Sequence, residues 1–208
     1  MEVQFYGANC VRLSGKKFSI VVDDNLDKLG MKSVTKPTDI SLRTSKLVPK
    51  REEVKFSADL PGEYEISGAI IHGIAARGHM DEKDKKTAVI YTVESDEVRV
   101  AVLGHIYPEL SDEQVESIGA VNAIIVPVGG NGYTLDGAGA LQLIKKIEPS
   151  IVIPTHYEDK AIKYEVPQAD LTTALKNMGM EVHETVAKIK ITPAELSDNI
   201  KLVVLERQ

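Results

Sequence analysis

The chain has 208 residues, of which 43% are hydrophobic and 27% are charged, so it is long enough to bury one hydrophobic core. Its formal net charge of −6 at pH 7 argues against a protein that binds nucleic acid through the phosphates. The single cysteine, Cys10, excludes an intramolecular disulfide and is typical of a reducing compartment. The sequence has neither an apolar run of about 18 residues nor a signal-peptide pattern. We therefore expect one cytoplasmic domain over residues 1–208 that does not enter a membrane.

The first half of the chain has the pattern of short strands. β-branched and aromatic residues are separated by turn signals such as Pro61-Gly62 and Ser67-Gly68, which is typical of an antiparallel meander. Residues 23–36 are polar and lack helical periodicity, so they are expected to form a loop. Strands are expected over residues 3–6, 11–13, 18–22, 39–43, 54–56, 63–66, 69–74, 87–93 and 98–103.

The second half alternates helices and strands. Ser111 and Gln114 have the spacing of a capping box, which predicts a helix over residues 111–118. An apolar stripe predicts a second helix over 135–147, and a third is expected over 167–178, ended by Gly179. No linker divides the two halves, so we expect one layered α/β sandwich with helices outside. The remaining strands are expected over residues 121–126, 151–153, 186–191 and 202–205.

Three of the five histidines follow predicted strands. His79, His105 and His156 each lie in the loop after an apolar segment, whereas His72 and His183 are interpreted as structural. Strand ends at one edge of a sheet bring polar side chains together, and imidazole is the commonest metal ligand at neutral pH. These three loops could therefore converge on zinc, although each histidine taken alone fits a hydrogen-bonded loop residue better. The glycine-rich loop at residues 127–132 is not a phosphate-binding P-loop, because no Gly-Lys-Ser/Thr follows it.

Several segments together resemble the metallo-β-lactamase-fold hydrolases, in particular the group similar to L-ascorbate-6-phosphate lactonase. The resemblance covers nearly the whole chain in the order of the family and implies a four-layer αββα sandwich. It is carried by YGANCVRL at residues 6–13, LPGEYEI at 60–66, VLGH at 102–105, IVPVGG at 125–130 with YTLD at 133–136, and PSIVIPTHY at 149–157.

The same resemblance implies that most of the family's metal ligands are missing. The H-x-H-x-D-H motif of the family corresponds to Ser45, Leu47, Pro49 and Lys50, which are expected at the cleft where the family holds its metals. Leucine and proline have no side-chain donor atom, and lysine adds a positive charge. The early Gly-His pair is Gly7-Ala8 here, and the family's bridging aspartate is His105. His156 matches the last metal-binding histidine and His79 the middle one. The usual dinuclear zinc mechanism is not expected.

Two functions remain open. The first is a non-hydrolytic scaffold or binding protein, a pseudoenzyme that binds a small molecule, a protein partner or a second copy of itself. The second is a metal-dependent hydrolase with a rebuilt mononuclear site of His79, His105 and His156, in which Asp23, Asp24 or a backbone carbonyl would fix each ring. The cofactor is accordingly either none or a single zinc ion. Nucleic-acid processing, known elsewhere in this superfamily, is disfavoured by the acidic charge.

Overall fold

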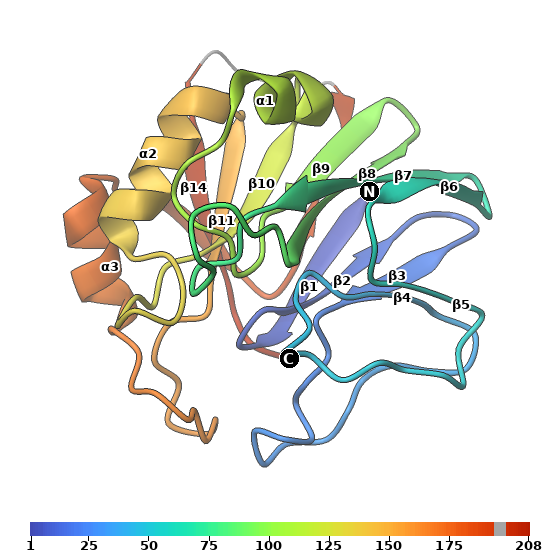
Figure 1. Ribbon diagram of the computed structural model, residues 1–208, viewed down its shortest axis with the longest axis horizontal. Coiled ribbons are helices and arrows are strands. Elements are labelled where there is room, and N and C mark those ends of the chain that lie inside the picture. Colours follow the sequence, from blue (N-terminus) through green and yellow to red (C-terminus); the bar gives the residue numbers. More distant parts are fainter. Residues whose placement is uncertain (194–198) are drawn as a thin grey trace.

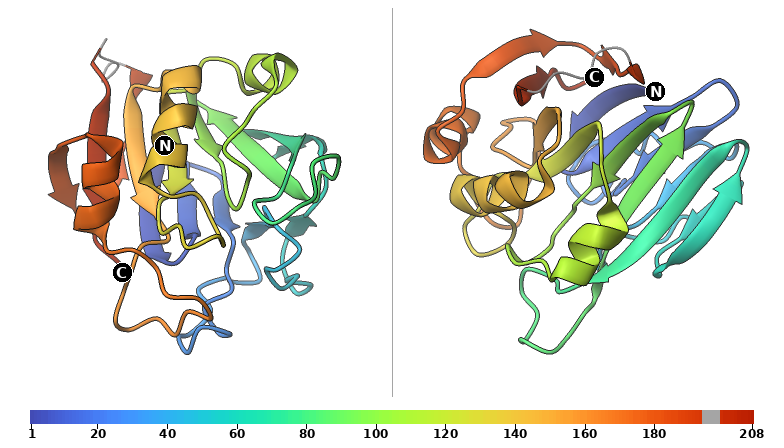
Figure 2. Two further views of the ribbon diagram at one scale, coloured as in Figure 1. Left: turned by 60° about the vertical axis from the view of Figure 1, so that its left-hand side comes forward. Right: turned by 90° about the horizontal axis from the view of Figure 1, so that it is seen from above.

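Two β-sheets packed face to face form the centre of the protein (Figures 1 and 2). The computed structural model describes residues 1–193 and 199–208. The first sheet has six strands, in the order β13-β1-β2-β3-β4-β5. Its strands are β1 (Glu2–Gly7), β2 (Cys10–Ser14), β3 (Ser19–Val22), β4 (Ile40–Leu42), β5 (Phe56–Ala58) and β13 (Ile189–Lys190).

The second sheet has eight strands, in the order β12-β14-β11-β10-β9-β8-β7-β6. Its antiparallel half is the predicted meander of β6 to β9, and its other half is parallel because helices connect the strands. The strands are β6 (Gly62–Ile66), β7 (Ala69–Ala76), β8 (Ala88–Ser95), β9 (Val98–Val102), β10 (Ala123–Pro127), β11 (Ile151–Thr155), β12 (Val182–Val186) and β14 (Lys201–Leu205).

Three helices cover the outer face of the eight-stranded sheet: α1 (Asp112–Ile118), α2 (Gly137–Ile147) and α3 (Leu171–Met178). The predicted capping box of Ser111 and Gln114 is present at α1. The predicted start of α3 at Pro167 is wrong, because the side chain of Asp170 accepts a hydrogen bond from the backbone N–H of Thr173 and caps the helix there. The preceding residues form a loop that crosses the candidate site.

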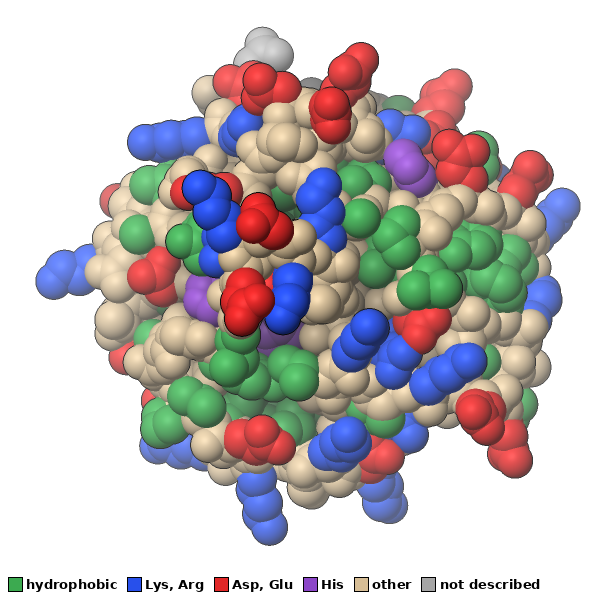
Figure 3. All heavy atoms as spheres, in the orientation of Figure 1, with side chains coloured by type: hydrophobic (Ala, Val, Ile, Leu, Met, Phe, Trp, Pro, Cys, Tyr) green, Lys and Arg blue, Asp and Glu red, His purple; other side chains and the backbone are tan. Residues whose placement is uncertain are grey.

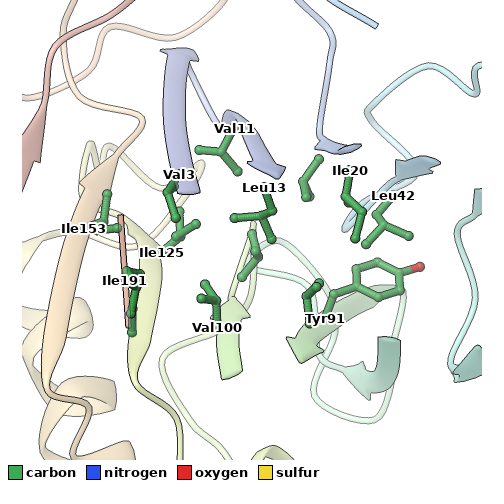
Figure 4. Packing of buried hydrophobic residues seen from close by; sticks show 14 of the residues in the cluster. Val3, Val11, Leu13, Ile20, Leu42, Tyr91, Val100, Ile125, Ile153 and Ile191 are labelled. Atoms are coloured by element: carbon green, nitrogen blue, oxygen red, sulfur yellow. The ribbon is translucent and has the colours of Figure 1, made fainter. Parts of the chain in front are cut away.

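The core between the sheets is built from the inward-facing side chains of both. Val11, Leu13 and Ile20 of the first sheet face Val100 and Ile125 of the second, as Figure 4 shows. Alternate strand positions point inward, which explains the alternating burial of β1. A second cluster packs the helices onto the eight-stranded sheet. The expected α/β sandwich of two face-to-face sheets is thus confirmed as a fold class.

Two details differ from the sequence prediction. The outer face of the six-stranded sheet is covered, in the part of the chain that is described, by the loop at residues 23–39 rather than by helices, with Leu26 packed on Cys10 and Val21. The single strand predicted over residues 186–191 is wrong. That segment is split, because β12 pairs with β14 in one sheet and β13 pairs with β1 in the other.

Candidate functional site

The candidate site lies where three loops leave the same edge of the eight-stranded sheet. Strands β9 and β11 both run parallel to β10, so His105 and His156, which follow them, come from the same end of the sheet. The two imidazole rings meet edge to face, with ring centroids 4.8 Å apart. His79, which follows β7, lies beside them because its backbone N–H donates to the carbonyl of His105 at 2.8 Å. The three predicted histidines therefore come from three adjacent loops.

His105 is deeply buried, with 5% of its surface exposed. Burial lowers its pKa to about 3, the positive charges that His156 and His79 can carry lower it further, and a hydrogen bond to the backbone of Tyr133 opposes the shift. Its Nδ1 atom is buried without a hydrogen-bond partner among the described residues. The ring is therefore neutral at pH 7.

His156 is 2% exposed, and burial lowers its pKa to about 4, against a smaller opposing effect of the hydrogen bond with Gln168. Its Nδ1 lies 3.1 Å from the side-chain oxygen of Gln168, whose amide nitrogen donates to the carbonyl of Val166. Because that bond orients the amide, its oxygen is the acceptor and the imidazole must donate through Nδ1. The lone pair of His156 is therefore on Nε2.

The glycine-rich loop is what allows this arrangement. A Cβ on Gly129 would lie 2.0 Å from the backbone oxygen of His156 and 2.2 Å from the side-chain oxygen of Gln168. Only glycine fits there, so the loop after β10 holds the loop after β11 in close contact. The predicted loop at residues 127–132 thus allows its backbone to lie directly against that of the loop after β11.

Aromatic rings surround the two buried histidines. Tyr133 contacts both, with centroid distances of 5.0 Å to His105 and 5.8 Å to His156. Tyr164 lies 5.1 Å from His156 on another side, and its hydroxyl donates to the carbonyl of Tyr157. Burial raises the pKa of both tyrosines, so both stay protonated at neutral pH. The site is a set of four rings rather than a cluster of charged ligands.

Two connected hollows open onto this set of rings. The larger, about 340 Å³, lies against His156, Tyr164 and Gln168, and the smaller, about 240 Å³, lies against His79 and His105. Lys46, Leu47 and Tyr133 line both, so we treat them as one cleft. In the face drawn in Figure 3, histidine side chains lie at the bottom of a hollow between charged and apolar side chains.

The positions that correspond to the family's metal motif are only partly in this cleft. Ser45 and Leu47 line it, and Leu47 is 52% exposed. The expectation for Pro49 and Lys50 is wrong: they lie outside the cleft, and Lys50 lines a separate surface hollow. The reason is Arg51, whose guanidinium binds Asp27 and the backbone of Asp24 and so directs the segment away.

Asp23 and Asp24 do not hold the histidine rings. Asp23 is bonded to Thr44, and Asp24 accepts hydrogen bonds from the loop of Ser33 and Thr35. Instead, the Nδ1 atom of His79 lies 3.3 Å from the backbone oxygen of Ile106, and that of His156 lies 3.1 Å from the side-chain oxygen of Gln168. A backbone carbonyl thus lies against one ring, and the expectation of a carboxylate is wrong.

A pair of metal ions of the kind the family binds does not fit this donor set. Among the described residues, no three His, Cys, Asp or Glu side chains are arranged to hold a metal ion. The cleft presents the hydroxyl of Ser45 and the aliphatic side chain of Leu47 where the family has two imidazoles. These side chains therefore do not provide the ligands that a hydrolytic step through a metal pair requires.

Sequence reasoning did not find Tyr133, Tyr164, Gln168 or the cleft lysines Lys28 and Lys46. Lysine and tyrosine are common on protein surfaces, and no local pattern marks Tyr164, Gln168, Lys28 or Lys46 as site residues. Tyr133 had the only detectable signal, since it follows the glycine-rich loop and lies in a segment that carries the family resemblance.

The comparisons agree with this architecture. Residues 2–156 match the family described as the Beta-lactamase superfamily domain. A metallo-β-lactamase superfamily protein from Thermotoga maritima has a TM-score of 0.74 at 22% identity, with 99% of each chain covered. Igni18, a metallo hydrolase from Ignicoccus hospitalis, has a TM-score of 0.61 at 18% identity, covering 99% of this chain and 95% of its own. The fold protein YhfI from Bacillus subtilis has a TM-score of 0.57 at 7% identity, covering 99% and 96%. No curated protein matches the chain.

The fold and the site thus define a metallo-β-lactamase-fold protein with a histidine- and tyrosine-lined cleft. The chain belongs to the β-lactamase superfamily, as the match over three quarters of its length shows. The three solved structures are all below 25% identity, so their likeness supports the fold and says nothing of the function. In the described part of the chain, no helix is long and apolar enough to cross a membrane.

Proposed function

We propose that this protein is a metal-free member of its superfamily that binds a small molecule in the cleft and does not hydrolyse it through metal-bound hydroxide. The observation that carries the proposal is Leu47, an exposed aliphatic side chain at the cleft where the family places a metal-binding imidazole. We further propose that it acts as one domain over residues 1–208 and in the cytoplasm, in keeping with its single cysteine.

The cleft has the character of a binding site rather than of a hydrolytic one. Clefts of about 300–1,000 Å³ lined by apolar groups and a few polar atoms are typical of small-molecule sites, and the larger hollow has about 340 Å³. His156 supplies a lone pair on Nε2 for a hydrogen bond, and Tyr133 and Tyr164 supply flat apolar surface.

Metal content tests the proposal directly. We expect the protein purified from zinc-supplemented medium to contain far less than one equivalent of zinc, manganese and iron by elemental analysis, and to show no tight zinc binding by calorimetry. A variant that carries both Ser45→His and Leu47→His is the positive control, because it adds two imidazoles to the cleft. Stoichiometric metal in the wild-type protein would refute the proposal.

A single zinc ion bound by His79, His105 and His156 is the second candidate. It is favoured by one observation: in His79 and His156 the Nδ1 atom lies against an oxygen acceptor, which leaves a lone pair on Nε2. Such acceptors commonly fix metal-binding histidines in the tautomer that the metal needs. Three imidazoles and a water would complete a tetrahedral site able to hydrolyse a substrate.

Zinc affinity of single variants separates the two candidates. The second candidate predicts that His105→Ala weakens zinc binding by tenfold or more, on the order expected for the loss of a ligand or its support. His183→Ala is the matched control, because His183 lies exposed on β12, away from the cleft. Equal and weak affinity in wild type and both variants supports the metal-free cleft.

A further inference from the structure

The larger hollow has two cationic side chains at its wall that form no ion pair with an acidic residue in the described part of the chain. Lys28 and Lys46 both line the larger hollow, and neither forms an ion pair within the described residues. Glu165 is the one acidic side chain among the residues that line the same hollow. Asp81 lines the smaller hollow, where its carboxylate accepts hydrogen bonds from Gly78 and Thr87. In the larger hollow, two ammonium groups against one carboxylate leave a net positive charge, which favours an anionic ligand there.

The floor of the larger hollow offers a hydrogen-bond acceptor. His156 lines this hollow, and its hydrogen bond with Gln168 leaves its Nε2 as an acceptor. A ligand that covers this acceptor without a donor would cost it its hydrogen bond to water, so a ligand donor is favoured. The ligand should therefore donate a hydrogen bond at this end.

A neutral donor suits this position better than a charged one. His105 and His156 are almost completely buried, so an ammonium group placed against them would lose most of its hydration. A hydroxyl group donates one hydrogen bond at a much smaller desolvation cost. Between the two ends, Tyr133 and Tyr164 offer ring faces that suit a flat apolar body.

We propose that the cleft binds a small organic acid that also carries a hydroxyl group. The carboxylate lies at Lys28 and Lys46, the hydroxyl donates toward the lone pair on Nε2 of His156, and the body lies against Tyr133. This rests on the proposed metal-free cleft, since a zinc ion would occupy the same lone pair.

Four aromatic probes of similar size test the proposal by calorimetry at pH 7: 4-hydroxybenzoate, benzoate, phenol and benzylamine. We expect 4-hydroxybenzoate to bind about tenfold more tightly than benzoate, which lacks the hydroxyl, and than phenol, which lacks the charge. Benzylamine, a cation, should not bind. Tightest binding by benzylamine, or no saturation by 4-hydroxybenzoate up to about 10 mM, would overturn the proposal.

Charge variants test the assigned positions without disturbing the core. Lys46→Gln and Lys28→Gln should each weaken 4-hydroxybenzoate binding about threefold to tenfold, and Glu165→Gln should strengthen it about twofold. Lys145→Gln, on the exposed face of α2, is the control and should leave affinity unchanged. Unchanged affinity in Lys46→Gln and Lys28→Gln together would overturn the proposal.

The outcome also separates this inference from the proposed function. Stoichiometric zinc in the wild-type protein would refute the proposed function, whatever the affinities of the four probes. A zinc-free protein that binds all four probes equally would agree with the proposed function and would overturn only the proposal of a hydroxylated organic acid.

Discussion

The buried carboxylate of Asp23 accepts two hydrogen bonds from Thr44, one from its backbone N–H at 2.7 Å and one from its hydroxyl at 2.5 Å. This pair ties the end of β3 to the turn that follows β4, next to Ser45. Burial raises the pKa of Asp23 to about 6, although both bonds from Thr44 oppose the shift. The turn is thus held by a group that is costly to ionise.

Asp23→Asn is expected to stabilise the protein at pH 7.5 and to have little effect at pH 4. A folded-state pKa raised above the unfolded value means that the stability contributed by Asp23 is present below pH 3.8 and is lost as the pH rises through 6. A shift of this size corresponds to about 3 kcal/mol, of which asparagine recovers part because it stays neutral. Urea unfolding of both proteins at the two pH values gives the difference; a larger effect at pH 4 would contradict the assignment.

The two buried histidines should make the protein less stable in acid. The pKa values of His105 and His156 are lowered to about 3 and 4, so their contribution is present above the unfolded value of 6.5 and is lost as the pH falls toward 4. Between pH 7 and 4.5 the protonation of each histidine should lower the free energy of unfolding by about 2–3 kcal/mol. This loss is larger than the stability that Asp23 gains over the same pH range. His105→Phe should lose about one half of the acid sensitivity that the two histidines cause, measured as the change in urea midpoint. His183→Phe, an exposed control, should keep it.

Gly104→Ala should destabilise the protein by more than about 2 kcal/mol, because two costs add. Gly104 has a φ of +63°, and a Cβ there would lie 2.2 Å from the hydroxyl oxygen of Thr44. Gly68→Ala is the matched control: its φ is +78°, but no atom lies within 4 Å of a new Cβ. The control should therefore show the backbone cost alone, about 1 kcal/mol, in thermal or urea unfolding. Equal losses in both variants would show that contact with Thr44 costs nothing.

Much of the fold was predictable because local patterns decide it. Continuous apolar runs predict β10 and β11, and the Ser111 cap predicts α1, since both depend on residues close in sequence. The split between β12 and β13 was not predictable from the sequence. The two strands pair with different sheets, and this pairing depends on tertiary packing rather than on the local pattern.

The site was predictable only in part for the same reason. Strand ends identified His79, His105 and His156, whose loops are neighbours in the structure. The contact of Gln168 with His156 joins a loop to a strand end through a tertiary hydrogen bond, and no pattern in the sequence reports it. The exclusion of Pro49 and Lys50 from the cleft likewise depends on Arg51 reaching Asp27 across the fold.

The tautomer of His156 provides the most direct test of the site geometry. The amide of Gln168 is oriented by its bond to the carbonyl of Val166 at 2.7 Å, so the imidazole must donate through Nδ1. We expect nitrogen-15 NMR of the histidine rings at pH 7 to show the Nδ1–H form for His156. In Gln168→Leu this donor loses its partner, so the ring should change to a mixture of tautomers and the protein should lose about 1–2 kcal/mol of stability. Gln142→Leu, at an exposed position of α2, is the control and should change neither quantity. An Nε2–H form in the wild-type protein would show that the amide is oriented the other way and donates to Nδ1, and would leave His156 without a free lone pair for a ligand.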